Sequence, residues 1–315
     1  MAPARIEIDS AAASPPATIE KPTVYLLDTF HPEAVEHAQN LFNAIIPSDP
    51  KHAQWRENAE YLLIRGSYLT AKDVASCPNL KAIGKQGVGI DKIDEAACKE
   101  RGIKIFNTPG VNAQAVAETV LTLTMSVARE VSRITTSQSH GKAVPKETCS
   151  GLIISNKTIG IVGMGNIGHR VAKIFQRGLR CNVVAYDPFL PKDAWSDIEH
   201  TRAEKLESLL ENSDIVTLHI PLLPQTRNLI GYEQFSTMKR NAIIINTARG
   251  GIVNEADLER ALKDKLIWGA GLDCHEQEPP TKEKYGALWE TGRVMETAKA
   301  AVDRLWDYVK VTRQL

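Results

Sequence analysis

The sequence predicts an α/β protein with two domains, each built around a doubly wound parallel sheet. Short runs of β-branched and aliphatic residues recur along the chain, and polar segments of helical length separate them, which is the spacing of βαβ units. Several of these runs are apolar on both faces, as strands covered by helices on two sides must be. With 315 residues, 43% of them hydrophobic, the chain is long enough for two such domains.

The first third of the chain contains one series of strand-like runs. The first 21 residues include an Ala-Ser-Pro-Pro stretch and are expected to form a disordered, solvated tail. After the series, the segment from Val111 to about Ile134 is apolar almost throughout and predicts one buried helix that connects two domains. The four expected strands are Thr23–Leu27, Tyr61–Ile64, Lys81–Gly84 and Lys104–Phe106.

A second series of strand-like runs follows from residue 157 onward. Beyond it, apolar residues at three- and four-residue spacing predict an amphipathic helix from Met295 to about Val311. The expected domains are therefore 22–111 together with 295–315, and 112–294. The five expected strands are Thr158–Val162, Val183–Tyr186, Asp214–Leu218, Ala242–Ile245 and Trp268–Leu272.

Composition excludes several classes of partner. The 38 basic and 38 acidic side chains balance, so no net charge attracts nucleic acid. The sequence contains no run of about 18 apolar residues, so no membrane span is expected. The five cysteines show no C-x-x-C spacing, which favours a reducing cytoplasm and gives no sign of a metal site. Small molecules are the expected partners.

A glycine-rich motif marks the expected cofactor site. Gly163 permits a tight turn, Gly165 lets a pyrophosphate approach the backbone, and Gly168 lets helix and strand pack closely. The following helix begins with free N–H groups and positive potential. This combination predicts a Rossmann-type dinucleotide-binding domain. The motif directly follows the run Thr158–Val162 and reads Gly163-Met164-Gly165-Asn166-Ile167-Gly168.

An acidic residue at the end of the next run indicates which dinucleotide binds. Asp187 follows Gly168 by nineteen positions, where a carboxylate accepts hydrogen bonds from the adenosine ribose hydroxyls and repels a 2′-phosphate. NAD(H) is therefore favoured over NADP(H). The alternative is a glycine turn kept for packing, with Asp187 on the surface.

A lone arginine follows the buried run Ala242–Ile245. Arg249 lies in Asn246-Thr247-Ala248-Arg249-Gly250-Gly251, which places it at the carboxyl edge of a parallel sheet. Its guanidinium fork suits a substrate carboxylate. Glu278 lies in the loop Asp273–Pro280 after the last expected strand.

These motifs resemble the D-isomer-specific 2-hydroxyacid dehydrogenases, in particular the D-3-phosphoglycerate dehydrogenase-like branch. The resemblance runs from about Thr23 to Val294. It implies a homodimeric oxidoreductase that transfers a hydride between NAD(H) and a small D-2-hydroxy acid or 2-keto acid, 3-phosphoglycerate-like acids among them. It also implies a smaller, flavodoxin-like substrate domain beside the NAD domain.

The resemblance also assigns roles to individual residues. Arg249 binds the substrate carboxyl and carbonyl groups, and Glu278 is the second catalytic residue. Arg65 holds a distal phosphate or, alternatively, is a surface arginine at a strand end. His219, before Ile220 and Pro221, is a structural or cofactor-contact histidine. The substrate loop is Gly87-Val88-Gly89, and further cofactor contacts come from Asn166, Ile167, Pro221, Thr247, Ala248 and Asp273.

One family element is missing from the sequence. The family's general acid is a histidine in a Ser/Thr-Pro-His segment that follows the glutamate, but no histidine occurs after His275 here. The simplest description is a lost segment that spans a strand end, the histidine loop and the first turn of the helix at Met295. His275 would then be a substitute acid or a partly exposed loop residue. Alternatives are an impaired NAD-binding sensor, as among the family's corepressors, or a truncated gene product.

Overall fold

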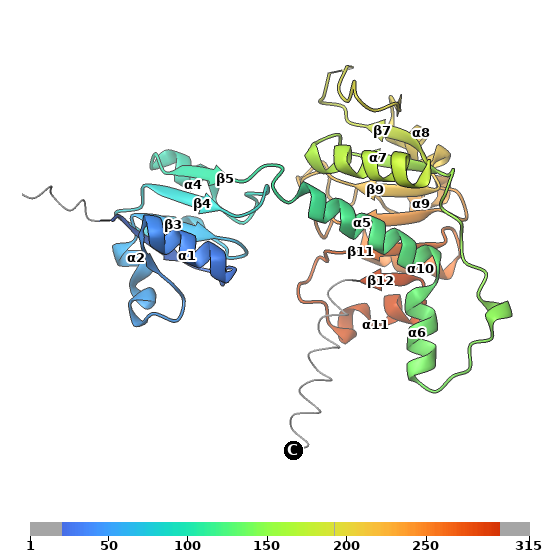
Figure 1. The fold of residues 1–315 in the computed structure, drawn as a ribbon, viewed down its shortest axis with the longest axis horizontal. Coiled ribbons are helices and arrows are strands. Elements are labelled where there is room, and N and C mark those ends of the chain that lie inside the picture. The colour runs from blue at the N-terminus through green and yellow to red at the C-terminus, as the bar shows by residue number, and fades with distance from the viewer. Residues whose placement is uncertain (1–20, 192, 297–315) are drawn as a thin grey trace, which may run out of the picture. The chain divides into compact units, whose positions relative to one another are not determined.

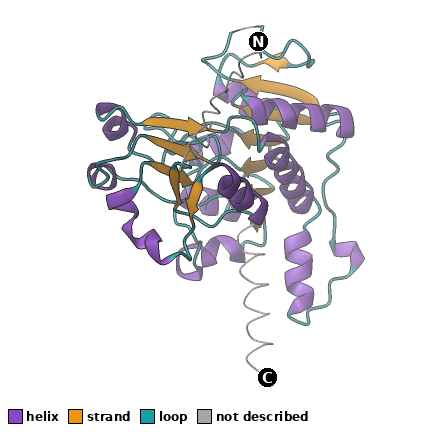
Figure 2. Cartoon of the chain, turned by 60° about the vertical axis from the view of Figure 1, so that its left-hand side comes forward, coloured by secondary structure: helices purple, strands orange, loops and turns teal. Residues whose placement is uncertain are grey.

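The computed structural model describes residues 21–191 and 193–296. The chain divides between Thr108 and Pro109 into two units, and each unit contains one parallel sheet (Figure 1). Every strand pair in both sheets is parallel, and helices flank the strands (Figure 2). The predicted class of two doubly wound α/β domains is confirmed. No described helix is long and apolar enough to cross a membrane.

The first unit has a five-stranded sheet in the order β2-β1-β3-β4-β5. Its core packs Tyr25, Leu62, Ile64 and Ile83 against the helices. Strand β2 was not predicted because it has three residues, of which only Ile45 is buried. The elements are β1 (Thr23–Leu26), α1 (Pro32–Leu41), β2 (Asn43–Ile45), η1 (Pro50–Gln54), α2 (Trp55–Asn58), β3 (Tyr61–Ile64), α3 (Ala71–Ala75), β4 (Ala82–Lys85), α4 (Glu95–Glu100) and β5 (Lys104–Asn107).

The second unit has a seven-stranded sheet in the order β12-β11-β10-β9-β6-β7-β8. One apolar cluster joins the sheet to α5 and α7, and another joins it to α8, α9, α10 and α11. The strands are β6 (Thr158–Val162), β7 (Asn182–Tyr186), β8 (Thr201–Arg202), β9 (Ile215–Leu218), β10 (Ile243–Asn246), β11 (Gly269–Leu272) and β12 (Val294–Glu296). The helices are α5 (Ala113–Ala128), α6 (Val131–Ser139), η2 (Lys146–Thr148), α7 (Asn166–Leu179), α8 (Leu206–Asn212), α9 (Tyr232–Thr237), α10 (Glu255–Lys263) and α11 (Lys282–Glu290).

The expected single helix from Val111 to Ile134 is wrong, because it breaks between α5 and α6 (Figure 1). Glu130 adopts left-handed backbone geometry with φ of 55°, and its carboxylate accepts a 2.9 Å hydrogen bond from Arg133. The backbone N–H of Leu152 donates to the carbonyl of Ala128, which a continuous helix would have used itself. The apolar run therefore forms two helices.

The expected helix start at Met295 is also wrong. Val294, Met295 and Glu296 form strand β12, which pairs in parallel with Ala270–Leu272 of β11. The strand end that the sequence comparison described as lost is therefore present. The rest of the predicted closing helix, 297–311, lies outside the described residues.

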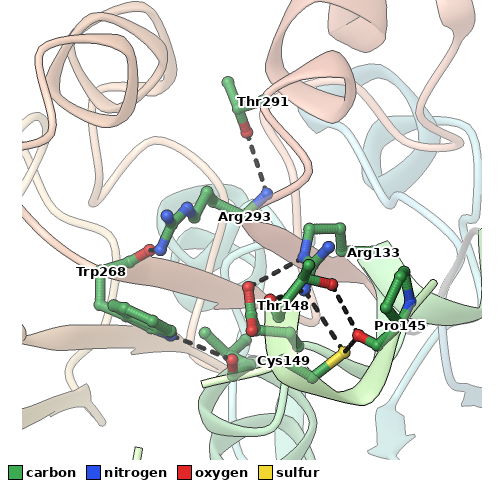
Figure 3. Close-up of polar contacts among 9 residues, drawn as sticks. Arg133, Pro145, Thr148, Cys149, Trp268, Thr291 and Arg293 are labelled. Carbon is green, nitrogen blue, oxygen red and sulfur yellow. Dashed lines mark hydrogen bonds and ion pairs between the residues drawn. The ribbon is translucent and has the colours of Figure 1, made fainter. Parts of the chain in front are cut away.

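Side chains fasten this edge of the sheet to α5 and fasten α6 to η2 (Figure 3). The guanidinium of Arg293 lies over the ring of Trp268 and donates to its carbonyl at 3.3 Å. The indole N–H of Trp268 donates to the carbonyl of Val127 on α5 at 3.2 Å. Arg133 of α6 reaches the carbonyl of Thr148 at 3.3 Å. These contacts join segments far apart in the sequence.

Candidate cofactor and substrate site

Five neighbouring strands of the second sheet, β7, β6, β9, β10 and β11, end in register with one another. The register pairs Val162 with Tyr186 and Leu218, and it pairs Asn246 with Leu218 and Leu272. Neighbouring strands lie about 4.8 Å apart, and the sheet order reverses at β6, where ligands bind in open α/β sheets. The structure thus brings together the residues that directly follow five strands: Gly163, Asp187, His219, Thr247 and Asp273.

The glycine turn after β6 has the geometry that its sequence predicts. Gly163 has φ of 97°, and a Cβ there would lie 2.5 Å from the carbonyl oxygen of His219. A Cβ at Gly168 would lie 2.3 Å from the carbonyl oxygen of Gly163, so helix α7 and β6 pack too closely for a side chain. Around Gly165 no atom lies within 4 Å of a Cβ, and no side chain caps α7. The helix N-terminus therefore offers backbone N–H groups to an anion.

Asp187 is hydrogen-bonded to the glycine turn. Its Oδ2 accepts from the N–H of Met164 at 3.0 Å, and its Oδ1 accepts from the N–H of Phe189 at 3.0 Å. Arg202 lies beside this loop, but its guanidinium donates to backbone carbonyls, including those of Asp187 and Leu190. No sequence pattern predicts this role of Arg202, because its partners lie eleven to fifteen residues away.

Two buried polar atoms face the same edge without hydrogen-bond partners among the described residues. They are Oγ1 of Thr247 and Nδ1 of His219. The other ring nitrogen of His219 lies 3.0 Å from Oγ1 of Thr217. Burial lowers the pKa of His219 to about 3, so the imidazole is neutral near pH 7. Buried polar atoms are normally hydrogen-bonded, so this pair fits a polar ligand such as a dinucleotide.

The loop that carries Arg249 is held by Asn246. The Asn246 side chain donates to the carbonyl of Arg249 at 2.8 Å and accepts from the N–H of Ala248 at 3.1 Å. The Arg249 guanidinium donates to the carbonyl of Ala248 at 2.7 Å. A Cβ at Gly250 would lie 2.0 Å from the carbonyl of His275, so the loop presses against the segment after β11.

That segment carries Asp273 and Glu278. The N–H of Asp273 donates to the carbonyl of Asn246 at 2.9 Å, which continues the pairing of β10 and β11. Glu278 is exposed, and its Oε1 accepts from the backbone N–H of His275 at 3.2 Å. The predicted catalytic pair Arg249 and Glu278 therefore lies on two adjoining loops. Pro221, in the exposed turn after β9, lies beyond the same edge.

His275 contradicts the expectation of a partly exposed loop residue. Its side chain is 1% exposed, and its Nε2 lies 3.0 Å from Oε1 of Glu296, which is also 1% exposed. The imidazole packs edge-on against Tyr285 at 5.0 Å between ring centroids. The backbone of His275 contacts Gly250. Its side chain lies between Glu296 of β12 and Tyr285 of α11. Sequence reasoning missed Glu296 because it expected a helix there.

In the first unit, the predicted substrate loop is fastened to the end of β5. Gly87 has φ of 108°, and its N–H donates to Oγ1 of Thr108 at 2.9 Å. The side chain of Asn107 donates to the carbonyl of Val88 at 2.7 Å. The loop that ends at Gly89 therefore has a fixed backbone, as a site that binds through N–H groups requires.

The exposed Arg65 belongs to a loop that Asp28 organises. Asp28 accepts backbone hydrogen bonds from Arg65 at 2.5 Å, from Gly66 and from Ser67. Burial raises the pKa of Asp28, but these bonds outweigh it and leave that pKa below its usual value. Sequence reasoning missed the buried Lys85, whose Nζ donates to the carbonyls of Arg65 and Gln86 at 2.7 and 2.6 Å. The signal that could have revealed Lys85 is a charged residue at an inward position of a strand, β4.

A parallel sheet with a glycine turn at its switch point, an acid after the next strand and unpartnered polar atoms at the same edge defines a dinucleotide-binding α/β protein. The NAD-binding domain of the D-isomer specific 2-hydroxyacid dehydrogenases matches residues 121–301 of the chain. The chain belongs to this family, and the residues at the edge of its second sheet fit NAD.

Individual relatives agree with this assignment. The chain is 38% identical to the hydroxypyruvate reductase of Thermotoga maritima over 240 residues, which cover 76% of each chain. It is 34% identical to the D-3-phosphoglycerate dehydrogenase of Methanocaldococcus jannaschii over 261 residues, 82% of this chain and 49% of that one. The chain thus spans about half the length of the latter. The structure of D-lactate dehydrogenase from Aquifex aeolicus complexed with NAD and lactic acid matches with a TM-score of 0.74 and 25% identity, over 92% and 94% of the chains.

Proposed function

We propose that the chain binds NAD(H) at the carboxyl edge of its second sheet and interconverts a D-2-hydroxy acid and its 2-keto acid slowly. The observation that carries this proposal is that Gly163, Asp187, Thr247 and Asp273 each directly follow a strand at the carboxyl edge of the sheet whose order reverses at β6. When bound, NAD(H) supplies or accepts the hydride. The protein contributes binding, orientation and charge.

The cofactor residues divide into two groups. Gly163, Gly165 and Gly168, with Asn166 and Ile167 in the first turn of α7, would hold the pyrophosphate through backbone N–H groups. Asp187 would accept the ribose hydroxyls. Because Arg202 already donates to backbone carbonyls, NAD is favoured over NADP. The nicotinamide half would meet Pro221, Thr247, Ala248, Arg249 and Asp273.

The substrate residues all suit an anionic acid. Arg249 would bind the carboxylate and polarise the carbonyl oxygen, where negative charge develops during reduction. In the first unit, the backbone N–H groups of Val88 and Gly89 suit a carboxylate, whereas that of Gly87 already donates to Thr108. Arg65 would meet a distal phosphate in a phosphorylated acid. These roles favour small 2-keto acids such as hydroxypyruvate, glyoxylate and phosphohydroxypyruvate.

Protonation of the substrate is the step that this chain supports least. Hydride arrival at the carbonyl carbon leaves an alkoxide that must receive a proton. The family's histidine is missing, and the ring of His275 is enclosed against Glu296 and Tyr285. Loss of a general acid typically costs about 10²- to 10⁴-fold in rate. Cofactor binding involves none of these groups, so it should persist.

An NAD-responsive protein without turnover is the alternative function. The enclosure of His275 favours it, because the cofactor edge is then complete while the proton donor is not. NADH binding with no detectable oxidation would support this alternative.

We further propose a cytoplasmic homodimer. Val131 and Ile153 on and beyond α6 are exposed, the latter by 71%, and such apolar side chains suit a subunit interface. All five cysteines are free thiols, as in a reducing compartment. Light scattering after size exclusion should give twice the monomer mass of 34.7 kDa. A monomer mass at micromolar concentration would contradict the dimer.

The experiment that tests the proposed function uses one purified sample. NADH and NADPH are titrated by fluorescence, and hydroxypyruvate, glyoxylate or phosphohydroxypyruvate is then added while absorbance follows NADH. We expect micromolar binding of NADH, weaker binding of NADPH, and slow oxidation with at least one acid. A sample that is folded by circular dichroism but binds neither nucleotide would contradict the proposal.

A further inference from the structure

A tryptophan outside the glycine motif contacts the turn that is expected to hold the pyrophosphate. Trp195 lies between β7 and β8, it is buried, and its indole N–H donates to the carbonyl of Met164 at 2.8 Å. A Cβ built on Gly168 would lie 3.3 Å from Cζ2 of the indole. The third glycine of the motif therefore makes room for Trp195 as well as for β6.

The two peptide groups that flank the Met164 Cα are each held by one side-chain hydrogen bond. The N–H of Met164 donates to Asp187 at 3.0 Å, and its carbonyl accepts from Trp195 at 2.8 Å. Met164 directly precedes Gly165, where the pyrophosphate is expected to approach the backbone. The orientation of this backbone therefore depends on Trp195 as well as on the glycines.

The segment that carries Trp195 is fastened to the outer side of α7. Oδ1 of Asp197 lies 2.8 Å from Nε2 of His169, and Oδ2 lies 2.7 Å from Nζ of Lys173. These two partners hold the pKa of Asp197 well below its usual value. The indole also packs edge-on against His169 and His200, at centroid distances of 5.7 and 5.6 Å. Trp195 is thus held in place by contacts on several sides.

We propose that Trp195 is a positioning residue for the dinucleotide, which it serves by fixing the Met164 carbonyl in the apo protein. The inference rests on the proposed NAD(H) binding. A turn that is ordered before the cofactor arrives loses less conformational freedom on binding, so affinity rises. Trp195 does this through Met164 without touching the cofactor itself.

The substitution Trp195→Phe tests the inference, because it keeps an aromatic ring and removes the N–H donor. We expect the Kd for NADH to rise roughly three- to tenfold, the equivalent of one lost hydrogen bond. The Kd for ADP-ribose should rise by the same factor, because the turn meets the pyrophosphate that both ligands share. Isothermal titration calorimetry measures both.

The matched control is Trp268→Phe. Trp268 also donates its indole N–H to a backbone carbonyl, that of Val127 on α5 at 3.2 Å (Figure 3). This control should lower the melting temperature without changing either Kd. If Trp195→Phe lowered the melting temperature equally and left both Kd values within twofold of wild type, Trp195 would be merely structural and the inference wrong.

A second variant covers the case in which Trp195→Phe does not fold. Asp197 is exposed, so Asp197→Asn weakens the same segment without disturbing the core. A twofold or larger rise in the Kd for NADH supports the inference, and an unchanged Kd overturns it. Wild-type protein that binds NADH but oxidises it with no acid would contradict only the proposed reaction. Wild-type protein that binds no NADH would overturn both.

Discussion

The N–H of Met164 donates to Oδ2 of Asp187 at 3.0 Å, so the acid expected to meet the ribose also shapes the turn expected to meet the pyrophosphate. The two halves of the adenosine site are therefore one hydrogen-bonded unit at the ends of β6 and β7. A change at either residue should affect affinity for the whole nucleotide.

Replacing Asp187 tests this unit. Asp187→Ala should weaken NADH binding at least tenfold, because both the ribose acceptor and the bond to Met164 are lost. NADPH binding should weaken less, because the repulsion of a 2′-phosphate disappears as well. Fluorescence titration with both nucleotides gives the ratio. Asp193→Asn, an exposed change in the same loop, is the control, and an unchanged NADH to NADPH ratio in Asp187→Ala would refute the assignment.

Arg249 should separate substrate binding from cofactor binding. Arg249→Lys keeps the charge but loses the planar fork, so kcat/KM for hydroxypyruvate should fall roughly 10- to 100-fold, the equivalent of a charge-assisted hydrogen bond. The Kd for NADH should stay within about twofold, because the adenosine and pyrophosphate contacts remain. The control is Arg240→Ala, at an exposed arginine that precedes β10, and it should change neither value. Equal kcat/KM in Arg249→Lys and wild type would exclude the proposed role.

His275 and Glu296 form a buried pair whose loss should destabilise the second unit. Either Glu296→Leu or His275→Phe leaves one polar partner enclosed, and breaking a buried pair typically costs about 3–5 kcal/mol. The double variant His275→Phe/Glu296→Leu should recover much of this cost. Denaturant unfolding measures all three free energies. Additive losses in the double variant would show that the two side chains do not stabilise each other.

His219 should make stability depend on pH below neutrality. Its folded pKa of about 3 lies below the unfolded value of 6.5, so the unfolded chain binds the extra proton first as pH falls. The free energy of unfolding is therefore highest above pH 6.5 and declines between pH 6.5 and 3. From pH 7.5 to 5.5 the loss from this group is about 1.4 kcal/mol.

The measurement is denaturant unfolding of wild type, His219→Asn and His140→Gln at both pH values. His219→Asn should remove this part of the loss, and His140→Gln, at the exposed histidine that directly follows α6, should keep it. The same pH dependence in all three proteins would rule out a buried neutral His219.

Much of the fold follows from hydrophobic pattern alone. Strands such as β6, β9 and β10 are almost wholly buried, so their apolar runs are continuous and easily recognised. The missed strands β2 and β8 have three and two residues at sheet edges, too few to show a pattern. The α5–α6 break depends on a backbone bond from Leu152, 24 positions beyond Ala128, which periodicity does not reveal.

Some residues of the candidate site can likewise be recognised from the sequence, and others only from the folded chain. Glycines are recognisable because only they fit turns such as those at Gly163 and Gly168, and Asp187 lies at a fixed distance from them. Lys85 and Trp195 act through backbone carbonyls 20 and 31 positions away, so only the folded chain shows their roles. The enclosure of His275 depends likewise on β12, which brings Glu296 beside it.

The central claim is that cofactor binding persists while proton donation is impaired. The most direct measurement is kcat for NADH oxidation with saturating hydroxypyruvate, on protein whose NADH stoichiometry has been determined by titration. An ordinary enzyme turns over at about 10 s⁻¹, and loss of the general acid predicts about 0.1 s⁻¹ or less with one NADH bound per chain. A kcat near 10 s⁻¹ would contradict the account, because another group would then donate the proton efficiently.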